Sequence, residues 1–169
     1  MQKSVIISKI LYYFSKLTSG LYVITGLYGL LSWVTNTHLL VSNDQTIITY
    51  PFTEQAFLIL ESHTTYVIFA FLIPVFAYGL FFWLLSNVFK VFYQKKLFTL
   101  QNIAHLRQFY LVNIFLPTLL TIFISFFMPI ERELSLLIIL HFVLGVFVFF
   151  MSEIFSQGLN LQNEQDLYI

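Results

Sequence analysis

The chain has 169 residues, of which 59% are hydrophobic, 20% are aromatic and only 9% are charged, and its net charge is zero. Soluble globular domains carry about 25% charged residues, so this composition excludes an ordinary soluble domain and indicates lipid as the solvent of most of the chain. The zero net charge also excludes a broad basic face for nucleic acid, and the absence of cysteine excludes disulfides and cysteine-ligated metal centres.

Four stretches carry no charged residue except at an end, and each is long enough to cross a bilayer as a helix. We therefore predict an all-α fold, an integral membrane four-helix bundle that forms a single domain over residues 1–169. The predicted spans cover about residues 17–38, 64–89, 109–129 and 134–153. They are connected by an outer loop at about 39–63 and an inner loop at 90–108, and a tail follows at 154–169.

The basic residues predict the orientation of these spans. Seven of the eight precede the first span or lie between the second and third, and only Arg132 falls on the opposite side. By the positive-inside rule, both termini and the loop at 90–108 are expected in the cytoplasm. This orientation predicts a multi-pass protein of the bacterial cytoplasmic (inner) membrane.

The segment before the first span is basic, and no small-x-small cleavage site follows Trp33, so we expect a retained signal anchor. Residues 5–14 are expected to extend the first helix into the cytoplasm, and a short helix on the inner leaflet is the alternative. The outer loop contains a β-prone run at residues 46–50. We expect this loop to form an apolar cap against the membrane, and a sensing surface is the alternative.

Small and polar residues inside the spans are candidates for helix packing or for a polar pathway. Glycines at 26, 29 and 145 are interpreted as close-contact positions. Span three carries a polar series at spacings that place several members on one helix face. Its members are Asn113, Thr118, Thr121 and Ser125.

His141 is the clearest ionisable residue within a span, and such residues are functional candidates by default. A membrane haem needs two facing ligands, and His38, His63 and His105 lie at other depths. We interpret His141 as a neutral imidazole hydrogen-bonded to a neighbouring helix or to water, and we expect no metal and no cofactor. A proton relay or a ligand to a metal is the alternative.

The inner loop and the tail have complementary charge. Thr99 is a candidate N-cap for a short helix that carries Leu100, Ile103 and Leu106 on one side, and the surrounding loop is basic. Gly158 is expected to cap or break the fourth helix, and the tail beyond it is acidic. We therefore predict that the tail folds back onto the loop, although two separate solvated segments would also fit.

These two segments resemble the signatures of a bacterial membrane family called domain of unknown function 2975. The match before the third span consists of Phe98, Thr99, Asn102, Leu106 and Arg107. The match at the end of the chain consists of Gly158, Leu161, Glu164, Asp166, Leu167 and Ile169, while Tyr168 stands where the family usually has threonine. The resemblance implies four spans and a cytoplasmic protein partner, such as a small helix-turn-helix regulator.

The leading hypothesis is a non-enzymatic membrane protein that regulates or binds a partner through its cytoplasmic loop and tail. The alternative is an oligomeric channel or transporter subunit with Asn113, Thr121 and His141 along the path. A redox enzyme fits least, since paired histidines and cysteines are missing from the sequence. The expected contacts are the lipid bilayer, a cytoplasmic protein and copies of the same chain, with no direct contact to nucleic acid.

Overall fold

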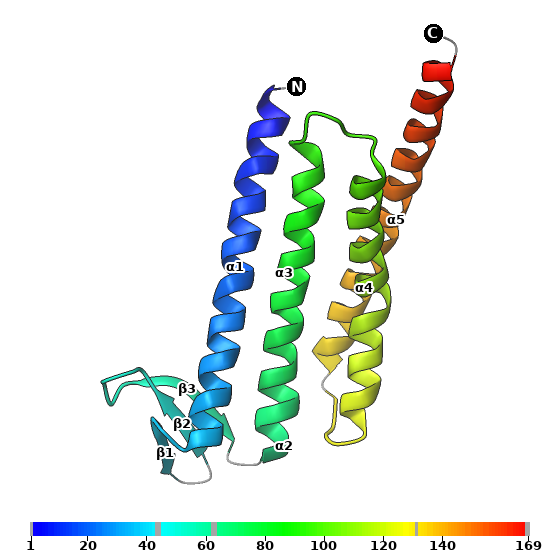
Figure 1. The fold of residues 1–169 in the computed structure, drawn as a ribbon. Helices are drawn as coiled ribbons and strands as arrows, with labels where there is room; N and C mark the ends of the chain where they lie inside the picture. The colour runs from blue at the N-terminus through cyan, green and yellow to red at the C-terminus, as the bar shows by residue number, and fades with distance from the viewer. Residues whose placement is uncertain (1, 43–44, 62–63, 131, 168–169) are drawn as a thin grey trace.

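The structure is a computed structural model that describes residues 2–42, 45–61, 64–130 and 132–167 (Figure 1). His63, Tyr168 and Ile169, which entered the predictions above, lie outside these residues. The long helices are α1 (Gln2–Thr35), α3 (Ile73–Phe92), α4 (Leu100–Ser125) and α5 (Arg132–Leu167). Strands β1 (Leu39–Ser42), β2 (Gln45–Thr49) and β3 (Ala56–Glu61) follow α1, and α2 (Thr64–Tyr66) continues through the π-helical η1 (Val67–Leu72) into α3.

Each predicted span corresponds to one long helix, and all four helices are long and apolar enough to cross a membrane. Helix α1 runs unbroken through residues 5–14, so the expected extension of the first helix is confirmed. At 1.5 Å per residue, α1 and α5 are each about 50 Å long, whereas the hydrocarbon core of a bilayer is about 30 Å thick. When α1 and α5 span a bilayer, part of each helix therefore extends beyond the hydrocarbon core.

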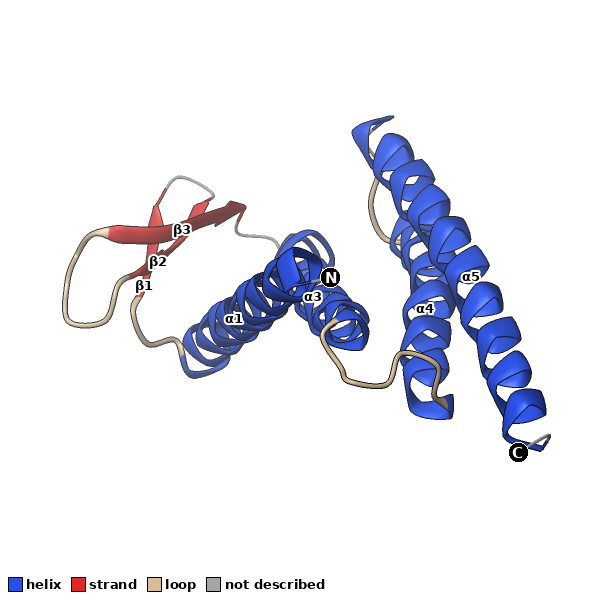
Figure 2. Cartoon of the chain, turned by 90° about the horizontal axis from the view of Figure 1, so that it is seen from above, coloured by secondary structure: helices blue, strands red, loops and turns tan. Residues whose placement is uncertain are grey.

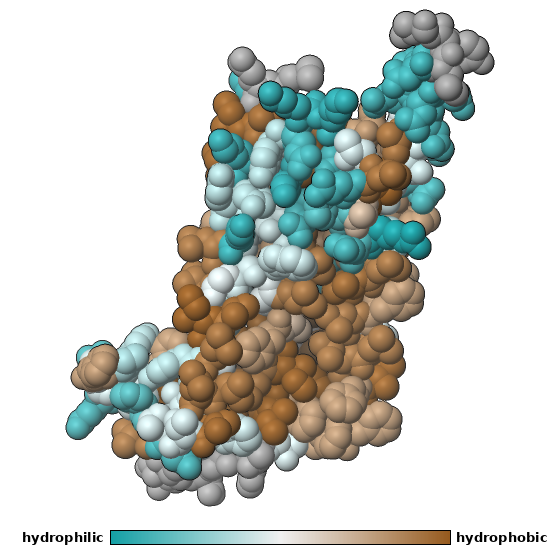
Figure 3. Space-filling view, in the orientation of Figure 1, coloured by the Kyte–Doolittle hydropathy of each residue, from teal (hydrophilic) through white to brown (hydrophobic). Residues whose placement is uncertain are grey.

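The two ends of the helix bundle differ in the polarity of their surfaces. The start of α1, the α3–α4 loop (residues 93–99) and the end of α5 lie at the same end of the molecule, which places the two ends of the described chain on the same side (Figure 1). Hydrophilic surface gathers at this end, which we call the basic end, whereas a hydrophobic surface covers the helices below it (Figure 3). The opposite end, which we call the sheet end, carries the three strands.

The helices associate as two pairs. Helix α1 packs along α3 and α4 packs along α5, while α3 and α4 join the pairs (Figure 2). Small side chains allow α1 to approach η1 and α3. An added Cβ would lie 2.6 Å from the Phe71 ring of η1 at Gly29, and 2.9 Å from the Phe76 ring of α3 at Gly26. The Ser19 hydroxyl also donates to the Gly79 carbonyl at 2.8 Å. The close-contact interpretation of the glycines at 26, 29 and 145 agrees with this geometry.

The outer loop forms a three-stranded antiparallel sheet with the order β1-β2-β3, so the all-α prediction was wrong for this segment. The sheet lies beside the end of α1, away from α4 and α5 (Figures 1 and 2). The β-prone run at residues 46–50 supplies the central strand, whose Ile48 is fully buried against the helix ends. Phe52, at the β2–β3 turn, is 98% exposed, an exposure that fits the expected contact with the membrane surface.

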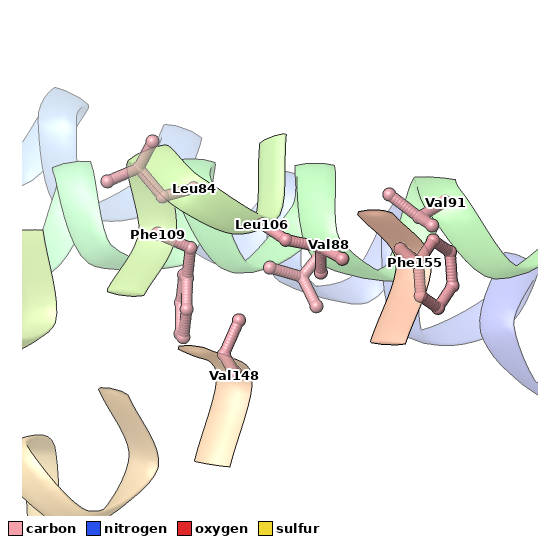
Figure 4. Packing of buried hydrophobic residues seen from close by; sticks show 7 residues of the cluster. All are labelled: Leu84, Val88, Val91, Leu106, Phe109, Val148 and Phe155. Atoms are coloured by element: carbon pink, nitrogen blue, oxygen red, sulfur yellow. The ribbon is translucent and has the colours of Figure 1, made fainter. Parts of the chain in front are cut away.

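A second apolar cluster fills the interior toward the basic end. It joins three residues of α3 to two of α4 and two of α5 (Figure 4). Its members are Leu84, Val88, Val91, Leu106, Phe109, Val148 and Phe155. This cluster fixes α3, α4 and α5 relative to one another just below the α3–α4 loop.

The Tyr28 hydroxyl tethers the sheet to α1, because it donates to the carbonyl of Thr49 in β2. Tyr28→Phe should lower the free energy of opening the sheet by about 1 kcal/mol, the usual contribution of one hydrogen bond. Hydrogen exchange of the β2 amides would measure this change. Tyr13→Phe is the matched control, since Tyr13 is exposed on α1, and equal exchange in both variants would contradict the tether.

Candidate functional site

The α3–α4 loop is held by one buried amide side chain. Asn102 has no exposed surface, and its Nδ2 donates to the carbonyls of Lys96 at 3.1 Å and Leu97 at 2.8 Å. Thr99 caps α4, since its hydroxyl accepts from the backbone N–H of Asn102 at 3.2 Å, so the N-cap prediction is confirmed. The loop is therefore closed onto the first turn of α4.

The same loop packs against α5 through an aromatic ring and a glycine. The Phe98 ring lies 5.4 Å from the Phe155 ring, and an added Cβ at Gly158 would come within 2.6 Å of it. Leu106 is fully buried in the cluster beneath this contact. We call this arrangement of Phe98, Asn102, Phe155 and Gly158 the loop latch.

The loop latch corrects the predictions for Gly158 and the tail. Helix α5 passes through Gly158 without a break and continues to Leu167, and no described glycine has a positive φ. Gly158 is thus a packing position, because its missing side chain makes room for the Phe98 ring. The end of α5 projects away from the loop (Figure 1), so the predicted fold-back of the tail was wrong.

The remaining signature residues face outward. Arg107 on α4 and Leu161, Glu164 and Asp166 on α5 are exposed. Within the described residues, no ion pair joins these acids to a base of the loop. Leu167 is the last residue of α5. The signature thus separates into residues that build the loop latch and residues that form the surface around it.

Aromatic residues connect the start of α1 to this loop. The Tyr12 ring lies 5.5 Å from the ring of Tyr93, the C-cap residue of α3, and Lys16 Nζ donates to the Tyr12 hydroxyl at 3.2 Å. Burial raises the pKa of Tyr93, and the neighbouring Tyr12 and Tyr13 add to this effect. A tyrosine phenol is neutral at physiological pH even at its ordinary pKa, so Tyr93 adds no negative charge to the loop.

The intramembrane polar residues meet in one cavity. Asn113 and Thr121 on α4 and His141 on α5 line a space of about 100 Å³ between α3, α4 and α5. Thr118 and Ser125, the other polar residues of the predicted series, are exposed on the surface of α4. The spacing of polar residues along α4 therefore identified Asn113 and Thr121, whereas His141 joins them because α5 packs against α4.

His141 is buried between helices. Its Nδ1 lies 2.9 Å from the Leu137 carbonyl, one turn back on the same helix, and its ring lies 5.1 Å from the Phe81 ring and 6.1 Å from the Tyr78 ring. The partner of Nδ1 is thus the backbone of α5, whereas the sequence suggested a neighbouring helix or water. Within the described residues, no group of three His, Asp or Glu side chains could hold a metal ion.

Sequence reasoning missed two contacts. The first is between Phe98 and Gly158, although an aromatic residue in one signature and a glycine in the other are complementary in size. The second is the aromatic wall of the cavity, where Tyr78 and Phe81 lie three residues apart on α3 and so share a face. Both contacts join residues on different helices, which spacing along one helix does not reveal.

The four long apolar helices indicate a multi-pass membrane protein. Residues 11–169 match a family model described as a protein of unknown function (DUF2975), and the chain belongs to this family. The resemblance inferred from the two signatures is thereby confirmed. No curated protein and no solved structure matches the chain.

Proposed function

We propose that this protein is a non-enzymatic regulatory partner in the bacterial cytoplasmic membrane, and that it binds a cytoplasmic protein at its basic end. The observation that carries the proposal is the loop latch, which holds a basic loop rigidly beside a projecting acidic helix. Asn102 and Leu106 are fully buried and Phe98 is half-buried against Phe155, so these residues support the surface from beneath.

The exposed surface has the composition of a docking site. Leu161 is 61% exposed and Ile154, two turns earlier on α5, is also exposed, so an apolar stripe faces outward. Glu164 and Asp166 flank the end of this stripe. Apolar anchors with charged neighbours are the usual elements of a helix that binds a partner.

The unpaired charge favours a partner with a basic surface. Glu153, Glu164 and Asp166 are all exposed on α5, and they form no ion pair within the described part of the chain. A helix with such carboxylates complements the basic surface with which a DNA-binding protein contacts phosphates. A small helix-turn-helix regulator, the partner implied by the family resemblance, fits this chemistry.

The cavity gives less support to the alternative of a channel or transporter subunit. Phe81 lines the cavity, and its ring lies 5.8 Å from the Phe109 ring of the apolar cluster. Between the three polar residues of the cavity and the basic end, packed apolar side chains therefore fill the interior. This geometry favours a binding space that ends at the apolar cluster over a continuous path.

A photoreactive benzophenone side chain at position 161 tests the docking proposal. In intact cells the proposal predicts a covalent adduct between Leu161→benzoylphenylalanine and one cytoplasmic protein. The matched control is position 136, because Leu136 is 71% exposed on the same helix but lies near the sheet end. Adding Glu164→Lys and Asp166→Lys should reduce the adduct at position 161 at least about fivefold, the range expected when opposite charges become repulsive.

Three outcomes would reject this surface as the docking site. They are no protein adduct at position 161, the same adducts at position 136, or an adduct that persists unchanged after both charge reversals. Membrane insertion of every variant is checked first by carbonate extraction.

A further inference from the structure

The cavity between α3, α4 and α5 is lined by polar side chains that donate to backbone carbonyls of their own helices, while side-chain acceptors stay unpaired. Asn113 Nδ2 directs one of its N–H groups to the Phe109 carbonyl at 3.1 Å, and the Thr121 hydroxyl donates to the Pro117 carbonyl at 2.8 Å. His141 Nδ1 faces the Leu137 carbonyl at 2.9 Å, which can only accept. Nδ1 is therefore the protonated nitrogen.

The side chains that line the cavity also carry hydrogen-bond acceptors that lack a donor. Asn113 is 2% exposed, and its Oδ1 is buried without any partner. In a neutral His141 with a protonated Nδ1, Nε2 is an acceptor. Pro117 has no N–H, so it also deprives the Asn113 backbone carbonyl of its regular partner one turn ahead. A buried acceptor without a donor is unfavourable in an apolar environment, so this site requires a donor.

The rest of the lining defines the body of the ligand. Apart from Asn113, Thr121, His141 and the Tyr78 ring, the lining side chains are apolar, and none of them is acidic. A cationic donor such as an ammonium group would therefore have no counter-charge within the membrane. A neutral hydroxyl group on an apolar molecule supplies the required donor and needs no counter-charge.

A second cavity provides room for an alkyl chain. It has a volume of about 240 Å³, lies toward the sheet end, and shares Pro74, Thr121, Ile124 and Leu134 with the first. One wall is formed by Tyr66 and by Phe69 and Ala70 of η1. A π-helical turn frequently marks a functional site, and here it borders the space that adjoins the polar residues.

We propose that these adjoining cavities bind a membrane-soluble alcohol, with its hydroxyl donating to Asn113 Oδ1 and its alkyl chain directed toward η1. His141 Nε2 is an alternative acceptor for the single proton of this hydroxyl. This site is independent of the docking surface at the basic end, so either proposal can fail without the other.

Photolabelling with two matched probes tests the site. The first probe is octanol with a diazirine on its chain, and the second is octane with the same diazirine and no hydroxyl. With purified protein in lipid nanodiscs, the octanol probe should label residues lining the two cavities about five- to tenfold more than the octane probe, as expected for one additional hydrogen bond. Excess unlabelled octanol should remove this labelling.

Variants identify the acceptor. Asn113→Leu, which keeps the branching of the side chain but removes Oδ1, should lower the ratio of octanol to octane labelling, because one of the two acceptors is lost. Ser125→Ala is the control, because Ser125 is a polar residue of the same helix outside the cavity, and it should leave the ratio unchanged. His141→Phe should lower the ratio, and it provides a second measurement if Asn113→Leu does not fold.

Three results would overturn the proposal. The first is equal labelling by both probes in the unmodified protein. The second is labelling that excess octanol does not displace, which would indicate general partitioning into lipid. The third is a cavity that neither probe labels, which would show that water alone supplies the donor.

Discussion

Gly158→Leu should be among the most destabilising substitutions in this protein. An added Cβ would lie 2.6 Å from the Phe98 ring, and this ring is itself packed against Phe155, so the α3–α4 loop must move away from α5. Overpacking of this kind typically costs about 1–3 kcal/mol in the free energy of unfolding. Denaturation in mixed detergent micelles would measure the loss.

Gly20→Leu is the matched control. No atom outside its own helix lies within 4 Å of an added Cβ at Gly20, and both substitutions gain the same helix propensity, about 0.8–1 kcal/mol for replacing glycine. The difference between the two variants therefore isolates the contact with Phe98. Trypsin should also cleave at Lys95 and Lys96 faster in Gly158→Leu than in Gly20→Leu, and equal cleavage would contradict the loop latch.

Asn102→Leu should have an effect of similar size. The substitution keeps the number and branching of the side-chain heavy atoms but leaves the carbonyls of Lys96 and Leu97 without their donor, and the loss of two hydrogen bonds at a buried position costs about 2–3 kcal/mol of unfolding free energy. Asn102→Asp should be at least as harmful, because a carboxylate cannot donate. The same denaturation measurement applies to both.

Asn163→Leu is the control for this pair, because Asn163 is exposed on α5 and should change the unfolding free energy by less than about 0.5 kcal/mol. If Asn102→Leu were as stable as Asn163→Leu, the amide of Asn102 would not close the loop. If Asn102→Asp were as stable as the unmodified protein, its donor would not be essential.

The sequence predicted most of the helical layout, because the scarce charges interrupt the apolar stretches near the helix ends. It also predicted the cap at Thr99 and the small-residue contact at Gly29, since both depend on local chemistry. The sheet was missed because its strands are short, and a run such as residues 46–50 becomes a strand only when neighbours pair with it.

The candidate site was less predictable than the helices, because it depends on contacts between distant segments. Glycine favours helix ends, so Gly158 suggested a break, yet the structure uses it to admit the Phe98 ring. Asn113 and His141 could each be recognised as unusual within an apolar span. That they line the same cavity depends on how α4 packs against α5, which spacing along a single helix does not determine.

The continuity of α5 has a mechanical consequence. The helix runs without interruption from His141 in the cavity to Leu161 at the projecting end, a distance of about 30 Å along its axis. Rotating such a rod by about 10° around His141 would displace Leu161 by about 5 Å, given this length. A small change in the tilt of α5 inside the membrane would therefore become a large displacement at its free tip.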